Sequence, residues 1–213
     1  MSCSNGATGA ATDVAAGAIL AGGAASRFGG RAKGLERVGG ARIIDRLAAM
    51  LTDTLGTAPL VVSNDPGAAR WAAGLSVVPD DLPGEGALGG IYTAVRQAPA
   101  PVICVAWDMP FVTRDVVRLL ADALAGGADA VLPASPGPRG VEPLCAGYGP
   151  ACEAAIRAAI ARGDRRAIAF HHDIRLRIIP LADISAIGDP ARLFFNINTA
   201  EDLEQAELQW AHP

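Results

Sequence analysis

Residues 18–34, AILAGGAASRFGGRAKG, decide the fold of this chain. The stretch begins with an apolar run that is typical of a buried strand, and it breaks at Gly22-Gly23. The loop that follows carries Arg27 and Lys33 between further glycines. Glycine lets backbone N–H groups come close to an anion, and arginine and lysine supply cationic donors. The stretch therefore indicates a strand that leads into a cradle for a polyphosphate.

Two common phosphate-binding loops do not fit this stretch. A Walker loop needs a glycine, four residues and then Gly-Lys-Ser/Thr, whereas Lys33 stands between Ala32 and Gly34. A dinucleotide-binding loop needs Gly-x-Gly-x-x-Gly, which Gly22-Gly23-Ala24 does not supply. The simple alternative is a glycine-rich turn with two surface cations, but strand, glycines and cations in one ordered block favour phosphate binding.

Outside this loop, strand-like and helix-like segments alternate, which favours a mostly parallel sheet with helices on both faces. We expect strands at residues 15–21, 60–62, 76–78, 102–106, 130–132, 142–148 and 175–179, with 102–106 central and 142–148 antiparallel. We expect helices near residues 43–51, 68–73, 86–97, 113–124, 150–162, 163–170 and 199–210. Thr113 is the expected N-cap of one helix, and Thr199 opens a capping box for the last.

The composition describes a globular protein. Hydrophobic residues make up 51% and charged residues 19%, and the net charge of −4 argues against nucleic acid as a partner. Residues 1–13 read as a disordered leader and residues 14–213 as one domain, without a membrane span. The four cysteines show no C-x-x-C spacing, so we expect free thiols and a cytoplasmic location.

Polar side chains follow four of the expected strands. The glycine loop follows the first strand, Ser63 and Asn64 the second, Asp80 the third and Asp108 the central one. In open α/β sheets, ligands bind beyond the carboxyl ends of the strands. These residues are therefore expected to meet around one ligand.

Asp108 is the main candidate for a metal ligand. It follows an apolar strand, and a carboxylate buried there must be hydrated, paired or bound to a metal. Mg²⁺ commonly takes one or two carboxylates together with phosphate oxygens. The alternative is that Asp108 caps the turn before Pro110.

The pattern Leu20-Ala21-Gly22-Gly23-x-x-x-Arg27-x-Gly29-x-x-x-Lys33 resembles the first loop of nucleotidyltransferases. Over residues 17–203 the chain is most similar to the molybdenum cofactor guanylyltransferases, which join GMP from GTP to molybdopterin. The resemblance implies an α/β, three-layer Rossmann-like nucleotidyltransferase fold with a mostly parallel central sheet and an antiparallel strand. The chain departs from the family at Ala32, where aspartate is usual.

In the N-terminal half, the resemblance implies a GTP site in which Arg27, Lys33 and Asp108 are catalytic and Asp108 holds Mg²⁺. The two cations would neutralise the triphosphate and the leaving pyrophosphate. The implied nucleotide-binding residues are Leu20, Ala21, Gly22, Gly23, Lys33, Ser63, Asn64, Asp80, Gly89 and Asp108. Turn formation explains Asn64 and Asp80 almost equally well, and helix packing explains Gly89.

In the C-terminal half, the resemblance implies an acceptor site. Arg165 and Arg166 match a Gly-x-Arg-Arg element, and Asn196 and Asn198 match an Asn-x-Asn-Thr element. The segment Glu142-Pro143-Leu144 also fits the family and would shape the side of the second substrate. The alternatives are surface arginines on a helix and an asparagine that only precedes a helix cap.

The expected activity is transfer of GMP from Mg-GTP to molybdopterin, with release of pyrophosphate. The choice of guanine rests largely on Gly22, because related molybdopterin cytidylyltransferases tend toward Leu-Ala-Ala-Gly. Another nucleotidyltransferase, acting on a sugar or alcohol phosphate, and a catalytically silent GTP-binding relative are the alternatives, and Ala32 keeps the latter open. Transient contact with cofactor-delivery proteins or molybdoenzymes is also expected.

Overall fold

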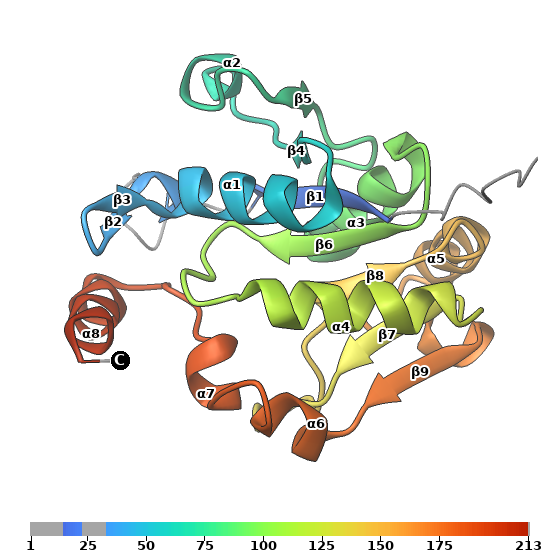
Figure 1. Ribbon diagram of the computed structural model, residues 1–213. Helices are drawn as coiled ribbons and strands as arrows, with labels where there is room; N and C mark the ends of the chain where they lie inside the picture. The colour runs from blue at the N-terminus through green and yellow to red at the C-terminus, as the bar shows by residue number, and fades with distance from the viewer. Residues whose placement is uncertain (1–14, 23–32, 213) are drawn as a thin grey trace, which may run out of the picture.

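The computed structural model describes residues 15–22 and 33–212, and the expected leader, residues 1–13, lies outside them. A seven-stranded sheet has the order β5-β4-β1-β6-β8-β7-β9 (Figure 1). Its strands are β1 (Ala16–Leu20), β4 (Leu60–Val62), β5 (Ser76–Val78), β6 (Val102–Ala106), β7 (Ala130–Pro133), β8 (Cys145–Tyr148) and β9 (Leu176–Ile179). A separate hairpin joins β2 (Arg37–Val38) and β3 (Ala41–Arg42).

The sheet is mostly parallel. β1 pairs in parallel with β4 and β6, β4 with β5, and β7 with β9. β8 is antiparallel to both of its neighbours, β6 and β7. The expected fold class, with one antiparallel strand beside a central β6, is therefore confirmed.

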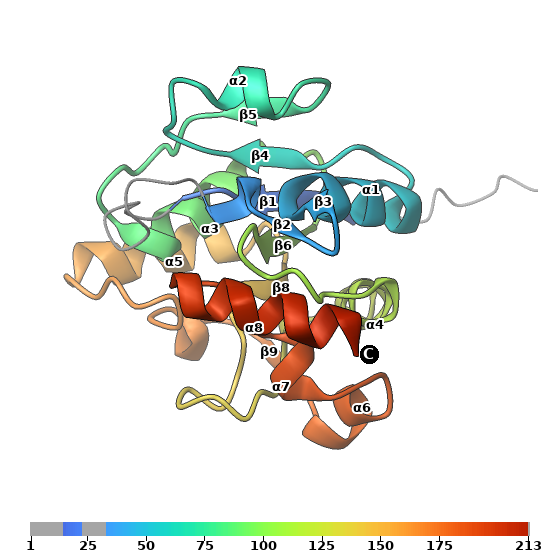
Figure 2. The ribbon, with the colours of Figure 1, turned by 90° about the vertical axis from the view of Figure 1, so that its left-hand side faces the viewer.

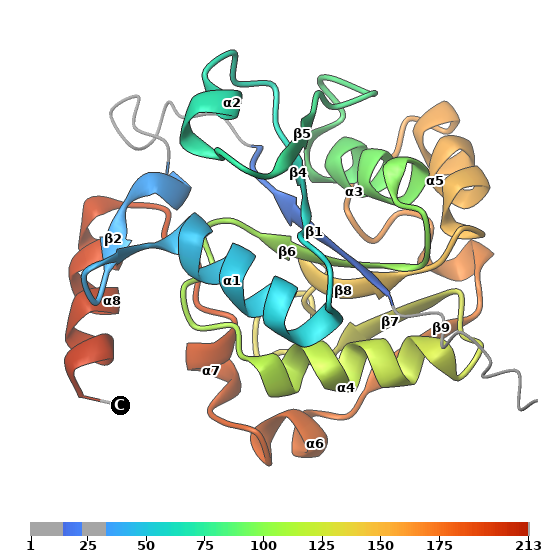
Figure 3. The ribbon, with the colours of Figure 1, turned by 45° about the horizontal axis from the view of Figure 1, so that its top comes forward.

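Helices cover both faces of the sheet, which gives three layers (Figures 1 and 3). α1 packs on α4 on one face, and α3 packs on α5 on the other. The helices are α1 (Ile43–Leu55), α2 (Ala68–Trp71), α3 (Gly86–Gln97), α4 (Arg114–Ala125), α5 (Cys152–Ala161), α6 (Leu181–Ser185), α7 (Pro190–Leu193) and α8 (Ala200–Ala211), with 3-10 turns η2 (Lys33–Leu35) and η3 (His171–Asp173).

β6 divides the core in two. All five of its residues are buried, and successive side chains point to opposite faces of the sheet. Ile103 and Val105 join the cluster beneath α1 and α4, whereas Cys104 joins the cluster beneath α3 and α5. Burial on both faces explains why this strand is apolar throughout. Among the described residues, Cys104, Cys145 and Cys152 are free and buried, and no helix has the length and apolarity to cross a membrane.

Both predicted helix caps are confirmed. The Thr113 side chain accepts a hydrogen bond from the Val116 amide at the start of α4. At the start of α8, Thr199 Oγ1 accepts from the Asp202 amide, and Asp202 accepts from the Thr199 amide in return. Each cap satisfies helix N–H groups that have no partner within the helix.

The expected helix over residues 163–170 is wrong. Turns occupy this segment, and the 3-10 turn η3 follows it. Asp164 Oδ1 accepts a hydrogen bond from the Arg166 amide, and such a side-chain turn competes with helix formation. The preceding helix α5 begins at Cys152, two residues later than expected.

The carboxyl ends of the four neighbouring parallel strands β5, β4, β1 and β6 share one edge of the sheet. Starting from β1, the strand order continues to β4 and β5 on one side and to β6 on the other. The strand order therefore reverses between β1 and β6, and this position is the topological switch point of the sheet. Figure 2 shows α8 across this end of the molecule. α8 is fixed to the β2-β3 hairpin, where the Gly39 amide donates to Glu207 at 3.2 Å.

Candidate functional site

Asp108 lies just beyond the carboxyl end of β6. The Trp107 amide donates to the Leu20 carbonyl at 3.2 Å, which extends the pairing of β1 with β6 by one residue. The Asp108 carbonyl accepts from the Ile197 amide at 3.0 Å, which brings the segment before α8 alongside. Its side chain is 17% exposed. The switch point between β1 and β6 thus presents one largely buried carboxylate.

Lys33 reaches this carboxylate from η2. Its Nζ lies 3.7 Å from Asp108 Oδ2 and donates to Asn198 Oδ1 at 2.8 Å. Gly34 makes this approach feasible, because a Cβ there would lie 2.4 Å from the Trp107 ring. Three segments far apart in the sequence, at Lys33, Asp108 and Asn198, therefore meet. The proximity of Lys33 to Asp108 agrees with the expectation, whereas Asn198 was expected at the acceptor site.

Burial dominates the electrostatics of Asp108. Desolvation raises the pKa of its carboxyl group, and the nearby Lys33 ammonium opposes that rise only in part. Asp108 Oδ1 is buried and has no hydrogen-bond partner among the described residues. An uncompensated oxygen of this kind fits a divalent cation, which prefers oxygen ligands.

A metal ion bound to Asp108 would take most of its ligands from outside the protein. Among the described residues, no group of three His, Cys, Asp or Glu side chains could hold a metal ion. Mg²⁺ in phosphate chemistry commonly binds one or two carboxylates and completes its shell with phosphate oxygens and water. A single Asp108 carboxylate therefore fits a metal that arrives with a polyphosphate.

The asparagine pair is held rigidly beside Asp108. The amides of Asn198 and Thr199 both donate to Asp202 Oδ2, at 2.8 and 2.9 Å. Asn196 Nδ2 donates to the Phe194 carbonyl at 2.9 Å, which fixes the orientation of its amide. The helix cap of α8 thus positions the Asn198 oxygen that binds Lys33.

The residues expected on the nucleoside side follow β1, β4 and β5. Leu20, Ala21 and Gly22 lie at the end of β1, where the Ala21 amide continues the pairing with β4 through the Val62 carbonyl at 2.9 Å. Ser63 is buried, and its Oγ accepts from the Asp65 amide at 3.2 Å. These residues lie on the β4 side of the switch point.

Asn64 and Asp80 are hydrogen-bonded to each other beyond β4 and β5, and Gly89 packs closely against Asp80. Asn64 Oδ1 accepts from the Asp80 amide at 2.8 Å, and Asp80 Oδ1 accepts from the Leu82 amide at 2.9 Å. A Cβ on Gly89 would lie 2.6 Å from the Leu82 carbonyl oxygen and 2.9 Å from Asp80 Oδ2. The turn and packing roles are therefore present, and contact with a nucleotide stays a prediction.

The two arginines of the expected acceptor site have acidic partners. Arg165 Nε lies 2.7 Å from Glu85 Oε2, which ties this turn to the start of α3. Arg166 forms a fork with Asp164, with its Nη2 2.6 Å from Oδ2. Both side chains are exposed. Of the remaining expected site residues, Gly23 and Arg27 lie outside the described part of the chain.

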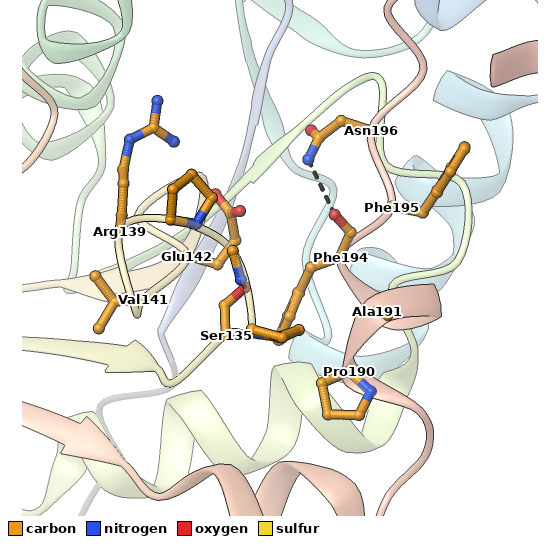
Figure 4. Close-up of a pocket in the computed structure, with 12 residues that line it drawn as sticks. Ser135, Arg139, Val141, Glu142, Pro190, Ala191, Phe194, Phe195 and Asn196 are labelled. Carbon is orange, nitrogen blue, oxygen red and sulfur yellow. Dashed lines mark hydrogen bonds between the residues drawn. The ribbon is translucent and has the colours of Figure 1, made fainter. Parts of the chain in front are cut away.

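A cavity of about 430 Å³ opens beside Asn196 (Figure 4). A turn with Ser135, Arg139 and Glu142 forms one wall, and Phe194 and Asn196 form the other. Sequence reasoning placed Glu142 on the side of the second substrate but did not predict the cavity. The available signals were the proline-rich turn at residues 133–139 and a glutamate just before an apolar strand.

Comparison with known proteins agrees with this geometry. Residues 17–175 match the family model described as the MobA-like NTP transferase domain. A molybdenum cofactor guanylyltransferase from Bradyrhizobium sp. strain ORS 278 is 36% identical and covers 94% of this chain and 95% of its own length. A probable molybdenum cofactor guanylyltransferase from Pelotomaculum thermopropionicum is 32% identical, with coverage of 91% and 92%.

Solved structures also include a similar protein. The crystal structure of molybdopterin-guanine dinucleotide biosynthesis protein A from Archaeoglobus fulgidus superposes with a TM-score of 0.76 and 26% identity. The match covers 92% of this chain and 99% of that one. The resemblance seen in the first loop is thus confirmed. The chain belongs to the MobA-like NTP transferase family and is a nucleotidyltransferase.

Proposed function

We propose that this chain transfers GMP from GTP to the terminal phosphate of molybdopterin and releases pyrophosphate, which yields the guanine dinucleotide form of the cofactor. The observation that carries the proposal is the meeting of Lys33, Asp108 and Asn198 at the switch point between β1 and β6. The names of the two relatives and of the Archaeoglobus protein support molybdopterin as the acceptor.

The proposed reaction is a direct displacement. An oxygen of the molybdopterin phosphate attacks the α-phosphorus of GTP and forms the new P–O bond. The bond from the α-phosphorus to the bridging oxygen of the β-phosphate breaks, and pyrophosphate leaves with that electron pair. Such transfers need little covalent chemistry from the protein, so positioning and charge neutralisation account for the rate.

Lys33 and Asp108 have complementary roles in this proposal. The Lys33 ammonium binds phosphate oxygens and neutralises charge on the leaving group, and we expect Arg27 to add a second positive charge. Asp108 would hold Mg²⁺ through its unpaired Oδ1. The bound metal supplies further neutralisation of the phosphates. Asn198 keeps the Lys33 side chain aimed at this point.

The two halves of the chain would bind the two substrates. We assign the nucleoside to residues on the β1, β4 and β5 side, namely Leu20, Ala21, Gly22, Gly23, Ser63, Asn64, Asp80 and Gly89. We assign the acceptor to the side of Arg165, Arg166, Asn196 and Asn198. The nucleoside residues follow β1, β4 and β5, whereas the acceptor residues come after β8 in the chain, which supports this division.

We further propose a cytoplasmic location and transient contacts with proteins that deliver or receive the cofactor. The buried, free thiols of Cys104, Cys145 and Cys152 support a reducing compartment. Cell fractionation, with the chain detected by antibody beside marker proteins of each compartment, tests the location.

Titration calorimetry with GTP, CTP and ATP, followed by a pyrophosphate-release assay with molybdopterin, tests the function. We expect GTP to bind best and pyrophosphate to appear only when Mg²⁺ and molybdopterin are present. Preference for CTP would reassign the chain to the cytidylyl type. GTP binding without pyrophosphate release would indicate the silent relative that Ala32 left open.

A further inference from the structure

The cavity beside Asn196 contains a buried carboxylate that the proposed reaction does not use. Glu142 is 8% exposed, and it is the only charged side chain among the buried polar residues of the described chain. Its Oε1 accepts from the Leu144 amide at 3.0 Å. Because a carboxylate has about four lone-pair sites, it can accept further hydrogen bonds from a ligand in the cavity.

The rest of the cavity suits a small ligand with apolar faces and polar edges. Figure 4 shows the turn with Arg139 and Glu142 opposite Phe194 and Asn196. Phe194 and Pro190 give the lining an apolar surface, and Asn196 adds an amide. A volume of about 430 Å³ lies within the range of small-ligand pockets, which combine apolar walls with a few polar groups.

The cavity adjoins the reacting centre. Asn196 lines it, and the next residue, Ile197, donates its amide to the Asp108 carbonyl at 3.0 Å. Burial raises the pKa of Glu142, the Leu144 amide and Arg139 oppose that rise, and the Asp108 charge adds to it slightly. A ligand in this cavity would therefore lie next to the proposed metal and phosphate site.

We propose that this cavity binds the pterin ring of the acceptor and that the Glu142 carboxylate recognises its donor edge. A pterin presents two adjacent N–H donors, on the 2-amino group and on N3, and a carboxylate accepts both side by side. Paired, charge-assisted hydrogen bonds of this type are strong and directional. The proposal rests on molybdopterin being the acceptor, and it adds which part of the acceptor this chain recognises.

Guanine carries the same donor edge, so the ring of GTP is the competing occupant. The position of Glu142 favours the pterin. Glu142 precedes β8, on one side of β6, whereas the residues assigned to the nucleoside follow β1, β4 and β5 on the other side. A guanine and a pterin on opposite sides of Asp108 would leave their phosphates to meet between them.

Kinetics of Glu142→Gln with both substrates form the first test. Glutamine keeps an oxygen for the Leu144 amide but places an N–H₂ group toward the donor edge. We expect the KM for molybdopterin to rise about 10- to 100-fold, as for loss of a buried charged acceptor, while the KM for GTP stays within about twofold. Glu153→Gln is the control, because Glu153 contacts Tyr92 outside the cavity. An unchanged KM for molybdopterin would overturn the proposal.

Binding of isolated rings gives a second test that needs no catalysis. Pterin and lumazine differ at position 2, where lumazine has an oxygen that would repel the carboxylate. Fluorescence titration should show at least about tenfold tighter binding of pterin to the wild-type protein, and Glu142→Gln should remove most of this preference. Equal binding of the two rings to the wild type would sink the proposal.

A further experiment with GTP distinguishes two outcomes: binding of guanine in this cavity, and failure of the proposed function. If Glu142→Gln instead removes discrimination between GTP and ITP, which lacks the 2-amino group, Glu142 reads guanine and the pterin assignment is overturned. If wild-type protein prefers pterin to lumazine through Glu142 but does not transfer GMP, the cavity assignment stands and the proposed activity fails.

Discussion

The Lys33 ammonium lies 3.7 Å from Asp108 Oδ2 and 2.8 Å from Asn198 Oδ1. One cation thus joins the first loop, the end of the central strand and the cap of the last helix. Both Lys33 and Asp108 are 17% exposed, so their interaction is less screened than a surface ion pair. In the proposed reaction, Lys33 would bind the phosphate oxygens and Asp108 the cation, so a triphosphate with its metal would replace this pairing.

Replacement of Asp108 by asparagine should separate activity from stability. We expect Asp108→Asn to lower metal-dependent GMP transfer at least about 100-fold, because the proposed metal ligand is lost. The same change should raise the free energy of unfolding by about 1 kcal/mol near neutral pH, because it removes a buried, incompletely paired charge. Pyrophosphate release and thermal unfolding without nucleotide measure the two effects.

The sign of the stability effect follows from the raised pKa of Asp108. A carboxyl group whose pKa is raised by folding destabilises the protein as pH increases from its unfolded pKa through its folded pKa. Asp108→Asn should therefore reduce the dependence of the unfolding free energy on pH in that range. Glu204→Gln, at an exposed position in the middle of α8, is the control and should change neither property. Full transfer activity in Asp108→Asn would contradict the metal assignment.

Asn198 should act through the position of Lys33. Asn198→Asp places a carboxylate against the Lys33 ammonium and beside Asp108, so we expect GTP affinity to fall about tenfold in calorimetric titrations. Asn198→Ala should mainly lower kcat, because Lys33 loses its 2.8 Å partner. Helix α8 should remain intact in both variants, since its cap uses the Asn198 backbone rather than its side chain.

Thr199→Ala gives the matching control for this segment. It removes the hydroxyl that caps α8, so we expect a loss of about 1 kcal/mol in unfolding free energy. GTP affinity should stay near the wild-type value because the Lys33 contact is kept. Equal GTP affinity in wild type and Asn198→Asp would show that the Lys33 contact has no role in binding.

Local sequence patterns were enough to predict most of the strands and their mostly parallel arrangement. β6 is apolar at all five positions because both of its faces are buried, and this pattern placed it centrally. The helix at Gly86–Gln97 was predicted with the bounds that the structure shows. The same apolar strand led to the prediction that Asp108, the carboxylate just beyond its end, is a metal ligand.

Local sequence patterns could not predict the contacts between distant segments. The close approach of Gly34 to the Trp107 ring depends on where two distant segments pack, and so does the cavity between Glu142 and Phe194. The false helix at residues 163–170 has a local cause, since the arginines and alanines of this segment favour a helix but the Asp164 side chain accepts from the Arg166 amide instead.

The two adjacent glycines of α3 should respond oppositely to alanine. Gly89→Ala would place a Cβ 2.6 Å from the Leu82 carbonyl oxygen, so we expect a loss of about 2 kcal/mol in unfolding free energy. Gly90→Ala would place a Cβ 3.7 Å from Leu20 Cδ2, an ordinary contact, and should gain up to about 1 kcal/mol from helix propensity. Urea unfolding measures both, and equal stability of the two variants would contradict the packing role of Gly89.

Gly22 should influence the choice of base without affecting the fold. A Cβ at Gly22 meets no heavy atom of the described residues within 4 Å, so Gly22→Ala should change stability by less than about 0.5 kcal/mol. We expect the ratio of GTP to CTP turnover to fall about tenfold, because the added methyl group stands where the base is proposed to bind. Competition assays with both nucleotides measure this ratio. Unchanged selectivity would remove the argument that assigns guanine from this position.

His171 should make the protein less stable in mild acid. Burial, with a smaller contribution from His172, lowers the pKa of His171 from 6.5 to about 4. The unfolded chain therefore binds a proton that the folded chain excludes, and stability falls as pH decreases from about 6.5 toward 4. Allowing for partial exposure, we expect His171→Leu to recover about 1 to 2 kcal/mol at about pH 4.5 relative to neutral pH. The exposed His172 provides the comparison His172→Gln, which should shift the pH profile only slightly in denaturant titrations, because His172 makes the smaller contribution to the pKa of His171. Parallel pH profiles for wild type and His171→Leu would show that His171 titrates normally in the folded protein.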